Sequence, residues 1–236
     1  MRCMLQSIAA LSLLFCSQGK VVADAVLSPG DILTANFGGN SITQVNPMTG
    51  AQAVVSSGGN FSAPLGIAID SSGSIIVTDV IHDEIIRVDP ATGAQTIISS
   101  DNNLIFPAGI TIDAAGDLLV ADRTAHEVIR IDPITGAQAV VSSGGNLSGG
   151  VGAGPNGIAI DAAGNILVAS GFGSIIRVNP TTGAQTIVSS GGSLQGPAGL
   201  AIDPVPEPSS IVLCGVVILA VGIVARRYRS RMRLSQ

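Results

Sequence analysis

The chain has 236 residues, enough for one domain of ordinary size together with targeting segments. Its 30 glycines, single tyrosine and lack of tryptophan favour short strands joined by tight turns, because a glycine costs a helix about 1 kcal/mol relative to alanine. Residues 26–203 carry fourteen acidic and four basic side chains, a net charge of −10. Such a surface repels polyanions, so nucleic acid is a poor partner.

The first 25 residues have the pattern of a signal peptide. Arg2 supplies positive charge, and residues 4–15 form an apolar run that is short for a membrane span. Small residues at Ala23 and Ala25 predict cleavage after Ala25. A lipoprotein signal with Cys16 as the modified residue is one alternative, although the residue before it is bulky. A buried N-terminal helix is another.

Two short motifs recur four times between residues 26 and 203. One reads Asn/Asp-Pro-x-Thr-Gly-Ala-Gln and begins, at spacings of 43, 43 and 47 residues, at Asn46, Asp89, Asp132 and Asn179. The other is an apolar strand pattern that ends in Asp and begins at Gly66, Gly109, Gly157 and Gly199. Periods near 43 residues are typical of repeat architectures, so each period should be one structural unit.

Each unit is predicted to contain four short strands, here called a, b, c and d. In the second unit these are residues 67–70, 75–79, 85–89 and 95–99. The Asn/Asp-Pro-x-Thr-Gly motif has a capping side chain, a fixed φ at Pro and a Gly that reaches positive φ, which predicts a hairpin turn. Four-stranded units of this length indicate an all-β fold, a β-propeller with four blades.

The ends of the repeat region predict how the ring closes. Residues 31–36 begin a first blade that has strands b, c and d only, and residues 199–203 supply a single strand a. If these two segments pair, a closed four-bladed ring has no free sheet edge between its first and last units. An open arc, or a dimer of arcs, is the alternative.

The segment 157–169, Gly-Ile-Ala-Ile-Asp-Ala-Ala-Gly-Asn-Ile-Leu-Val-Ala, resembles NHL-type repeats. It is also similar to the propellers of streptogramin lyases and gluconolactonase-like proteins. The resemblance covers about residues 31–203 and implies a propeller domain at 26–203. These families usually build about six blades, and this chain has four units.

Few side chains in residues 26–203 could perform chemistry, and this region has no cysteine. Two histidines in the turns between strands b and c could bind a metal together with Asp83 or Glu127; they are His82 and His126. A row in strand c could hold an acidic sugar, although pairing with acids such as Glu84 or Asp89 is favoured; it contains Arg87, Arg130 and Arg177, with Gln44 in the first unit. No cofactor is predicted, but Ca²⁺ could bind at the ends of the b strands, which are Asn36, Asp79, Asp122 and Ser170. Aromatic rings for sugar stacking are limited to Phe37, Phe61, Phe106 and Phe172.

The C-terminal tail, residues 204–236, has three parts in a fixed order. The motif at 205–209 contains Pro206, Glu207 and Pro208, and an apolar segment at 209–225 is long enough for a short transmembrane helix. A basic segment at 226–233 follows, and it should remain in the cytoplasm and orient the helix through Arg226, Arg227 and Arg229. This tail resembles the PEP-CTERM sorting signal, which implies recognition by an exosortase, a membrane protease of bacteria that make extracellular polysaccharide.

Together these features predict an exported protein, anchored in the inner membrane as a precursor and then placed on the cell surface or in the extracellular matrix. We expect a non-catalytic propeller that binds a polysaccharide or surface protein or serves a structural role. The alternative is an envelope lyase or hydrolase of the streptogramin-lyase or gluconolactonase type. Catalysis needs converging acid and base groups, which are sparse here.

Overall fold

The computed structural model describes residues 27–148 and 154–203. The predicted signal peptide at 1–25, with Ala23 and Ala25, lies outside the described residues, as does the predicted sorting tail at 204–236. Within the described ranges, no helix has the length and apolar character needed to cross a membrane.

The described residues form four antiparallel sheets, which we call blades A to D. Blade A contains β1 (Ile32–Asn36), β2 (Ser41–Val45) and β3 (Gln52–Ser57). Blade B contains β4 (Pro64–Ile69), β5 (Ile75–Asp79), β6 (Glu84–Val88) and β7 (Gln95–Ser100). Blade C contains β8 (Pro107–Ile112), β9 (Leu118–Asp122), β10 (Glu127–Ile131) and β11 (Gln138–Ser143). Blade D contains β12 (Pro155–Ile160), β13 (Ile166–Ser170), β14 (Ser174–Val178) and β15 (Gln185–Ser190). Two short 3-10 turns are η1 (Phe37–Gly39) and η2 (Gly145–Leu147).

The predicted hairpin turns form as the repeated motif requires. In blade A, Oδ1 of Asn46 accepts hydrogen bonds from the backbone N–H groups of Met48 and Thr49 at 2.9 and 3.0 Å. Gly50 closes the turn with φ of 71°, a left-handed conformation that glycine adopts without steric cost. The same side-chain contacts recur in the other blades from Asp89, Asp132 and Asn179. The motif therefore fixes the c–d hairpin of every blade.

The core lies between neighbouring blades, in three clusters of buried side chains. Ile42 of blade A packs with Ile75 and Val77 of blade B. Further clusters join blades B and C and blades C and D. The innermost strands β4, β8 and β12 also pack against one another along the inner edge. Each blade is thus stabilised by burying apolar faces against the next, as in a repeat protein with nearest-neighbour contacts.

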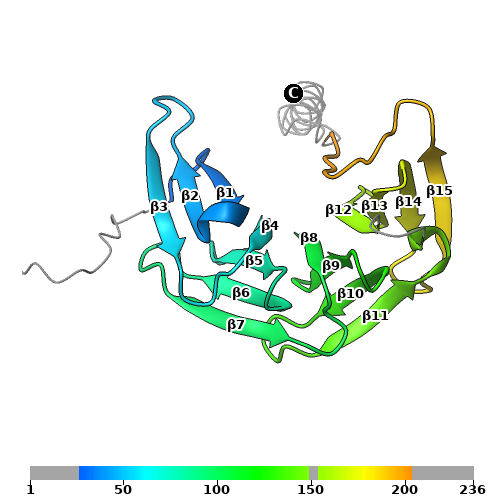
Figure 1. Cartoon of the computed structure of the whole chain (residues 1–236), viewed down its shortest axis with the longest axis horizontal. Coiled ribbons are helices and arrows are strands. Elements are labelled where there is room, and N and C mark those ends of the chain that lie inside the picture. Colours follow the sequence, from blue (N-terminus) through cyan, green and yellow to red (C-terminus); the bar gives the residue numbers. More distant parts are fainter. Residues whose placement is uncertain (1–26, 149–153, 204–236) are drawn as a thin grey trace, which may run out of the picture.

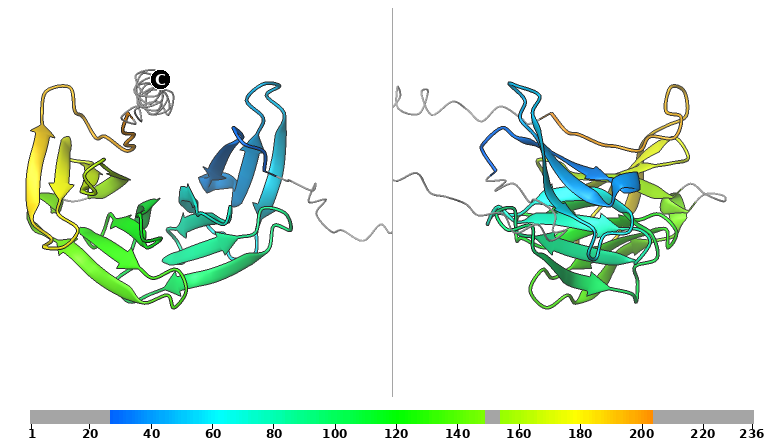
Figure 2. Two further views of the ribbon diagram at one scale, coloured as in Figure 1. Left: turned by 180° about the vertical axis from the view of Figure 1, so that it is seen from behind. Right: turned by 60° about the vertical axis from the view of Figure 1, so that its left-hand side comes forward.

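The four blades form an open arc, which corrects the prediction of a closed ring (Figure 1). The left view of Figure 2, seen from behind, shows the same separation between blades A and D. Among the described strands, β1 pairs with β2 alone, and residues 199–203 are not in a strand. The number of repeats was read correctly, but closure depends on the angle between blades. That angle is set by side-chain packing at each joint, which the repeat spacing does not report.

Candidate functional site

The innermost strands line a cavity of about 540 Å³ on the inner edge of the arc. Its walls come from β4, β8 and β12 and from residues 196–200, and they consist mainly of backbone and aliphatic side chains. The polar side chains in the lining belong to Arg123 and Asn156. With only these two polar side chains in the lining, polar contacts to a ligand here would come mainly from backbone groups of the innermost strands.

Arg123 was not among the predicted site residues. It follows β9, its backbone N–H donates to the Phe106 carbonyl at 3.0 Å, and its guanidinium carbon lies 5.8 Å from the centre of the Phe106 ring. This cation–π contact positions the charge at the inner edge. The sequence does distinguish Arg123 from the other arginines. Among residues 26–203, it is the one arginine outside the strand-c row of Arg87, Arg130 and Arg177.

The aspartates at the ends of the b strands organise backbone and do not form a cation site. Asp79 and Asp122 are fully buried. In each, Oδ2 accepts two backbone hydrogen bonds of 2.7–2.9 Å from the approach to the innermost strand, and Oδ1 accepts two more from the following turn. The other two blades have Asn36 and Ser170 here. Among the described residues, no three His, Cys, Asp or Glu side chains form a group that could hold a metal ion such as Ca²⁺.

The two histidines have local structural roles. His82 is exposed, and its Nδ1 lies 3.1 Å from the carbonyl oxygen of Asn60. His126 lies one position further along the equivalent turn and has φ of 56°. The matching turn position is also left-handed in the other blades, where it holds Asn40, Asp83 and Gly173. Since Gly, Asn, Asp and His tolerate this conformation best, the turn itself accounts for His126.

The strand-c arginines pair with acids, but with different acids from those expected. Their partners are the aspartates of the a–b turns rather than Glu84 or Asp89. The ion-pair distances are 3.9, 3.6 and 3.4 Å, respectively, for Arg87–Asp70, Arg130–Asp113 and Arg177–Asp161. Each pair is partly exposed, so its contribution to stability is about 0–1 kcal/mol. The charges of the three arginines are thereby neutralised by aspartates, so the arginines do not form one positive surface for an acidic ligand.

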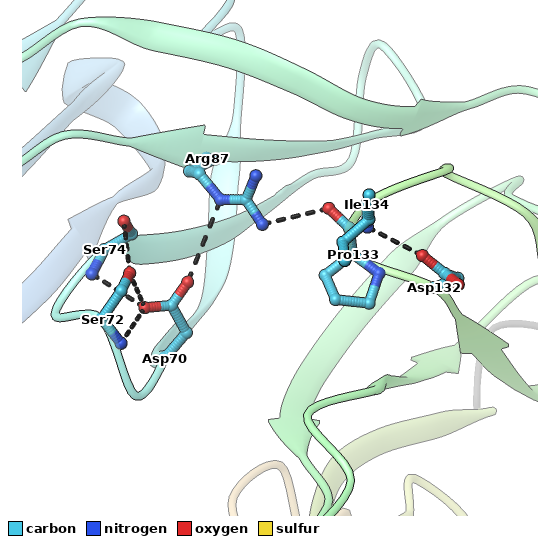
Figure 3. Close-up of polar contacts among 7 residues, drawn as sticks. All are labelled: Asp70, Ser72, Ser74, Arg87, Asp132, Pro133 and Ile134. Carbon is cyan, nitrogen blue, oxygen red and sulfur yellow. Dashed lines mark hydrogen bonds and ion pairs between the residues drawn. The ribbon is translucent and has the colours of Figure 1, made fainter.

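Figure 3 shows the pair in blade B and its link to blade C. Burial alone would raise the pKa of Asp70, but hydrogen bonds from Ser72 and Ser74 and the charge of Arg87 outweigh it and lower the pKa. The Nη2 of Arg87 also donates to the Pro133 carbonyl at 3.0 Å (Figure 3). Arg87 therefore joins two blades at the edge of a groove of about 490 Å³.

Three acids near the b–c turns have raised pKa values. Burial is the main cause for Asp83, Glu84 and Glu127, and the negative charge of Asp122 contributes for Asp83 and Glu127. One carboxylate oxygen of Asp83 and one of Glu84 are buried without a hydrogen-bond partner. These groups favour protonation more than ordinary surface acids do.

The aromatic side chains do not form one stacking surface. Phe37 and Phe172 are exposed, but they belong to blades A and D at opposite ends of the arc (Figure 1). Phe61 is buried in the joint between blades A and B. Phe106 is half-buried and carries Arg123. A sugar would therefore meet one exposed ring at most at either end.

A glutamine clamp between blades is a second feature that the sequence did not reveal. In blade B, Nε2 of Gln95 donates to Oγ of Ser56 at 2.9 Å and to the Gly58 carbonyl at 3.0 Å, in blade A. Its Oε1 accepts a 2.7 Å hydrogen bond from the backbone N–H of Asn60. Ser56 in turn donates to the Gly93 carbonyl at 2.7 Å. One side chain thus binds a whole turn of the preceding blade.

The clamp recurs at both other joints. Gln138 binds Ser99, and Gln185 binds Ser142, each with a 2.9 Å hydrogen bond. Both serines donate to a glycine carbonyl of the following blade at 2.8 Å. The glutamine is the last residue of the repeated motif in each unit, so its position could be predicted from the sequence. Its serine partner lies about 40 residues earlier, and the motif does not indicate that partner.

The comparisons with known proteins identify the fold. No family model matches the chain, and no curated protein matches it. Among solved structures, virginiamycin B lyase from Staphylococcus aureus is 20% identical with a TM-score of 0.59, and the match covers 73% of this chain and 56% of the lyase. A structure of a nidogen–laminin complex is 21% identical with a TM-score of 0.62, covering 75% of this chain and 65% of that chain. A protein described as a putative gluconolactonase is 17% identical with a TM-score of 0.57, covering 74% and 64%.

The chain has a β-propeller fold. At these identities the likeness concerns the fold alone, and the chain spans less than two thirds of each of these three proteins. The arc therefore corresponds to part of those propellers. This agrees with the opening between blades A and D, since four units at this curvature do not complete a circle (Figure 1).

Proposed function

We propose that this chain is an exported cell-envelope protein, sorted by an exosortase, whose propeller arc acts as a non-catalytic binding or structural module. The observation that carries the non-catalytic part is the use of its polar side chains. Asp79 and Asp122 hold backbone, the strand-c arginines pair with turn aspartates, and His126 fits a left-handed turn. Apart from the b–c turn acids Asp83, Glu84 and Glu127, few groups remain that could act as an acid–base pair.

The sorting part of the proposal rests on the tail sequence. Proline has no N–H donor, and a residue before proline favours extended backbone, so Pro206-Glu207-Pro208 cannot form regular helix. An extended peptide next to a predicted membrane span is the form that a protease requires. The arginines at 226, 227 and 229 would fix the depth and direction of that span. Glu207 is then a recognition determinant for the exosortase.

The test is replacement of Pro206, Glu207 and Pro208 by alanine in a host that has an exosortase. We expect export to continue while the tail stays uncut and the protein stays in the membrane fraction. The measurement is the mass and fractionation of the protein. Glu207→Gln is the matched variant, since it keeps both prolines and removes only the charge. Normal tail removal in the triple variant would refute sorting by this motif.

A lyase or hydrolase is the second candidate, and the similarity of fold to virginiamycin B lyase favours it. One solved structure is a catalytically inactive histidine-to-alanine variant of that lyase with quinupristin, at 18% identity and a TM-score of 0.59. The full-length chain would be incubated with a streptogramin B antibiotic and with simple lactones. Turnover that is lost in His126→Asn, which suits the same left-handed turn, would favour this candidate over the first.

A further inference from the structure

The two ends of the arc carry complementary halves of the joint that is repeated inside it. At each internal joint, one blade offers a serine hydroxyl and the turn after it, and the next blade offers a clamp glutamine. Ser56 is 4% exposed and Ser142 is 7% exposed because the next blade covers them. The joint also buries an apolar face on each side.

Blade D presents the uncovered serine half. Ser189 occupies the position of Ser56 in the repeat, but it is exposed. Val188 is 47% exposed, whereas Val55, its equivalent in blade A, is fully buried. Leu167 is also more exposed than its buried equivalents. An apolar face and a hydrogen-bonding turn thus lie open on this end of the arc.

Blade A presents the uncovered glutamine half. Gln52 is the clamp glutamine of its repeat, and it is exposed and has no clamp partner among the described residues. Ile32 is 52% exposed, whereas its equivalent Ile75 is fully buried. Thr34 replaces the apolar residue of the other blades on this face, which lowers the cost of leaving the face in water before it docks.

Among the described residues, blade A also has no innermost strand, while a sequence copy of that strand lies beyond blade D. Residues 197–203 repeat the sequence pattern of β4. A Cβ on Gly157 would lie 2.9 Å from the Ala198 carbonyl oxygen, much as a Cβ on Gly109 would lie 2.2 Å from the Asn156 carbonyl oxygen. The segment therefore follows blade D in the place of a next innermost strand, without a sheet to join.

We propose that a second copy of this chain docks head to tail, so that blade D and residues 197–203 of one copy complete blade A of the other. The register of β4 with β5 pairs Ile69 with Ile75 and Ala68 with Ile76. The same register would pair Ile202 with Ile32, and Ala201 with Leu33, of the other copy. The opening of the arc separates these halves within one chain (Figures 1 and 2), so a second molecule is needed to join them.

Two arcs joined at both ends form one closed ring of eight blades, within the usual range of four to eight for propellers. Each copy contributes the serine half of one joint and the glutamine half of the other. The pair therefore has a two-fold axis, and both ends of each arc are joined. The joint also removes the free edge of β1, which would otherwise be open to unspecific strand pairing. This inference concerns assembly and does not depend on the proposed function.

Gly199 provides a test that separates assembly from folding. Within one chain, a Cβ at Gly199 has no atom within 4 Å and the residue has no positive φ, so Gly199→Ala should leave the melting temperature of the arc unchanged. In the joined ring it takes the place of Gly66, where a Cβ would lie 2.3 Å from the Ala108 carbonyl oxygen of the next blade. We expect the dimer dissociation constant to rise at least tenfold.

The measurement is sedimentation of the full chain in mild detergent over a range of concentrations. Gly38→Ala is the matched control, because a Cβ there also has open space and the position lies in the turn after β1 rather than on the strand edge that pairs. It should change neither the mass nor the melting temperature. A wild-type chain that is monomeric throughout, or a Gly199→Ala variant that dimerises as well as the wild type, would overturn the proposal.

Cross-linking tests the direction of docking. In a chain with Cys3, Cys16 and Cys214 changed to serine, Gln52→Cys and Ser189→Cys are made separately and given different mass tags. When the two are mixed with a short thiol-to-thiol cross-linker, we expect one product containing one chain of each kind. Each variant alone should give little product. Equal products from each variant alone, or no mixed product, would refute head-to-tail contact.

Discussion

The Oδ2 atom of Asp79 accepts a hydrogen bond of 2.8 Å from the backbone N–H of Ala63, sixteen residues earlier in the chain. The same carboxylate also binds the turn that follows β5 through Oδ1. One buried side chain therefore holds both the entry to the innermost strand and the exit of the second strand. This explains why a buried aspartate lies at the end of β5 although no cationic partner for it is found among the described residues.

Replacing Asp79 by alanine should destabilise the protein by about 3 kcal/mol, because buried N–H groups lose their acceptor. Urea unfolding followed by circular dichroism measures this. Ser170→Ala, at the equivalent position in blade D, should cost less than about 1 kcal/mol, since its hydroxyl accepts one long hydrogen bond of 3.4 Å. Equal losses in the two variants would contradict the role assigned to the carboxylate.

Gly109 sets the close approach of blades C and D along the inner edge. A Cβ there would lie 2.2 Å from the Asn156 carbonyl oxygen, which is backbone and cannot move aside alone. Gly109→Ala should therefore destabilise the protein by about 2–3 kcal/mol, like other overpacked core sites. Thermal unfolding is the measurement. Gly116→Ala is a useful comparison, since a Cβ there has open space and only the φ of 94° opposes it.

The repeat could be read from the sequence almost to the residue, because turn chemistry and strand length are local properties. The b strand expected at 75–79 is β5, and the c and d strands expected at 85–89 and 95–99 differ from β6 and β7 by one residue. The a strand begins earlier than expected, at Pro64, because Pro64 pairs with Asp79 before a bulge. The prediction that the first unit itself supplies only strands b, c and d was confirmed, whereas its completion by residues 199–203 was not.

Contacts between repeats could not be read in the same way. The repeated glutamine was visible in the sequence, but its serine partner lies in the preceding blade. The strand-c arginines pair with aspartates of the a–b turns, and not with acids that are nearer in the sequence, such as Asp89. Ring closure failed as a prediction for the same reason. It depends on how far each blade turns relative to the last, which contacts such as that of Gly109 determine.

Because Gln95 forms a clamp and Gln52 does not, replacing each by alanine should change the unfolding free energy by different amounts. Gln95→Ala removes the contacts to Ser56, Gly58 and Asn60, and we expect a loss of about 2 kcal/mol from several part-buried hydrogen bonds. Gln52→Ala should leave the unfolding free energy of a single arc within about 0.5 kcal/mol, as for other surface sites. Chemical denaturation at low protein concentration makes the comparison, and similar losses would show that the clamp does not stabilise the joint.

Removing the charge of the turn acid Asp83 should stabilise the protein by an amount that depends on pH. Burial, and after it the negative charges of Asp122, Asp101 and Asp79, raise its pKa in the folded protein. Ionising it therefore costs more in the folded state than in the unfolded state, where its pKa is about 3.9. The folded state is penalised above the raised pKa, and the penalty disappears once the pH falls below the unfolded value.

Asp83→Asn should remove that penalty while keeping the left-handed turn, since Asn40 holds the same position in blade A with φ of 45°. We expect a stabilisation of roughly 0.5 kcal/mol or less at pH 7.5, because solvent screens the charges, and none at pH 3.

Asp132→Asn is the matched control, for which we expect an effect of opposite sign. Hydrogen bonds from Thr135 and Ile134 lower the pKa of Asp132, so its ionised form stabilises the fold above pH 4 and that benefit is lost in acid. Urea titrations of both variants at the two pH values measure the differences, and a gain for Asp83→Asn that persists at pH 3 would mean that its cause is not the charge.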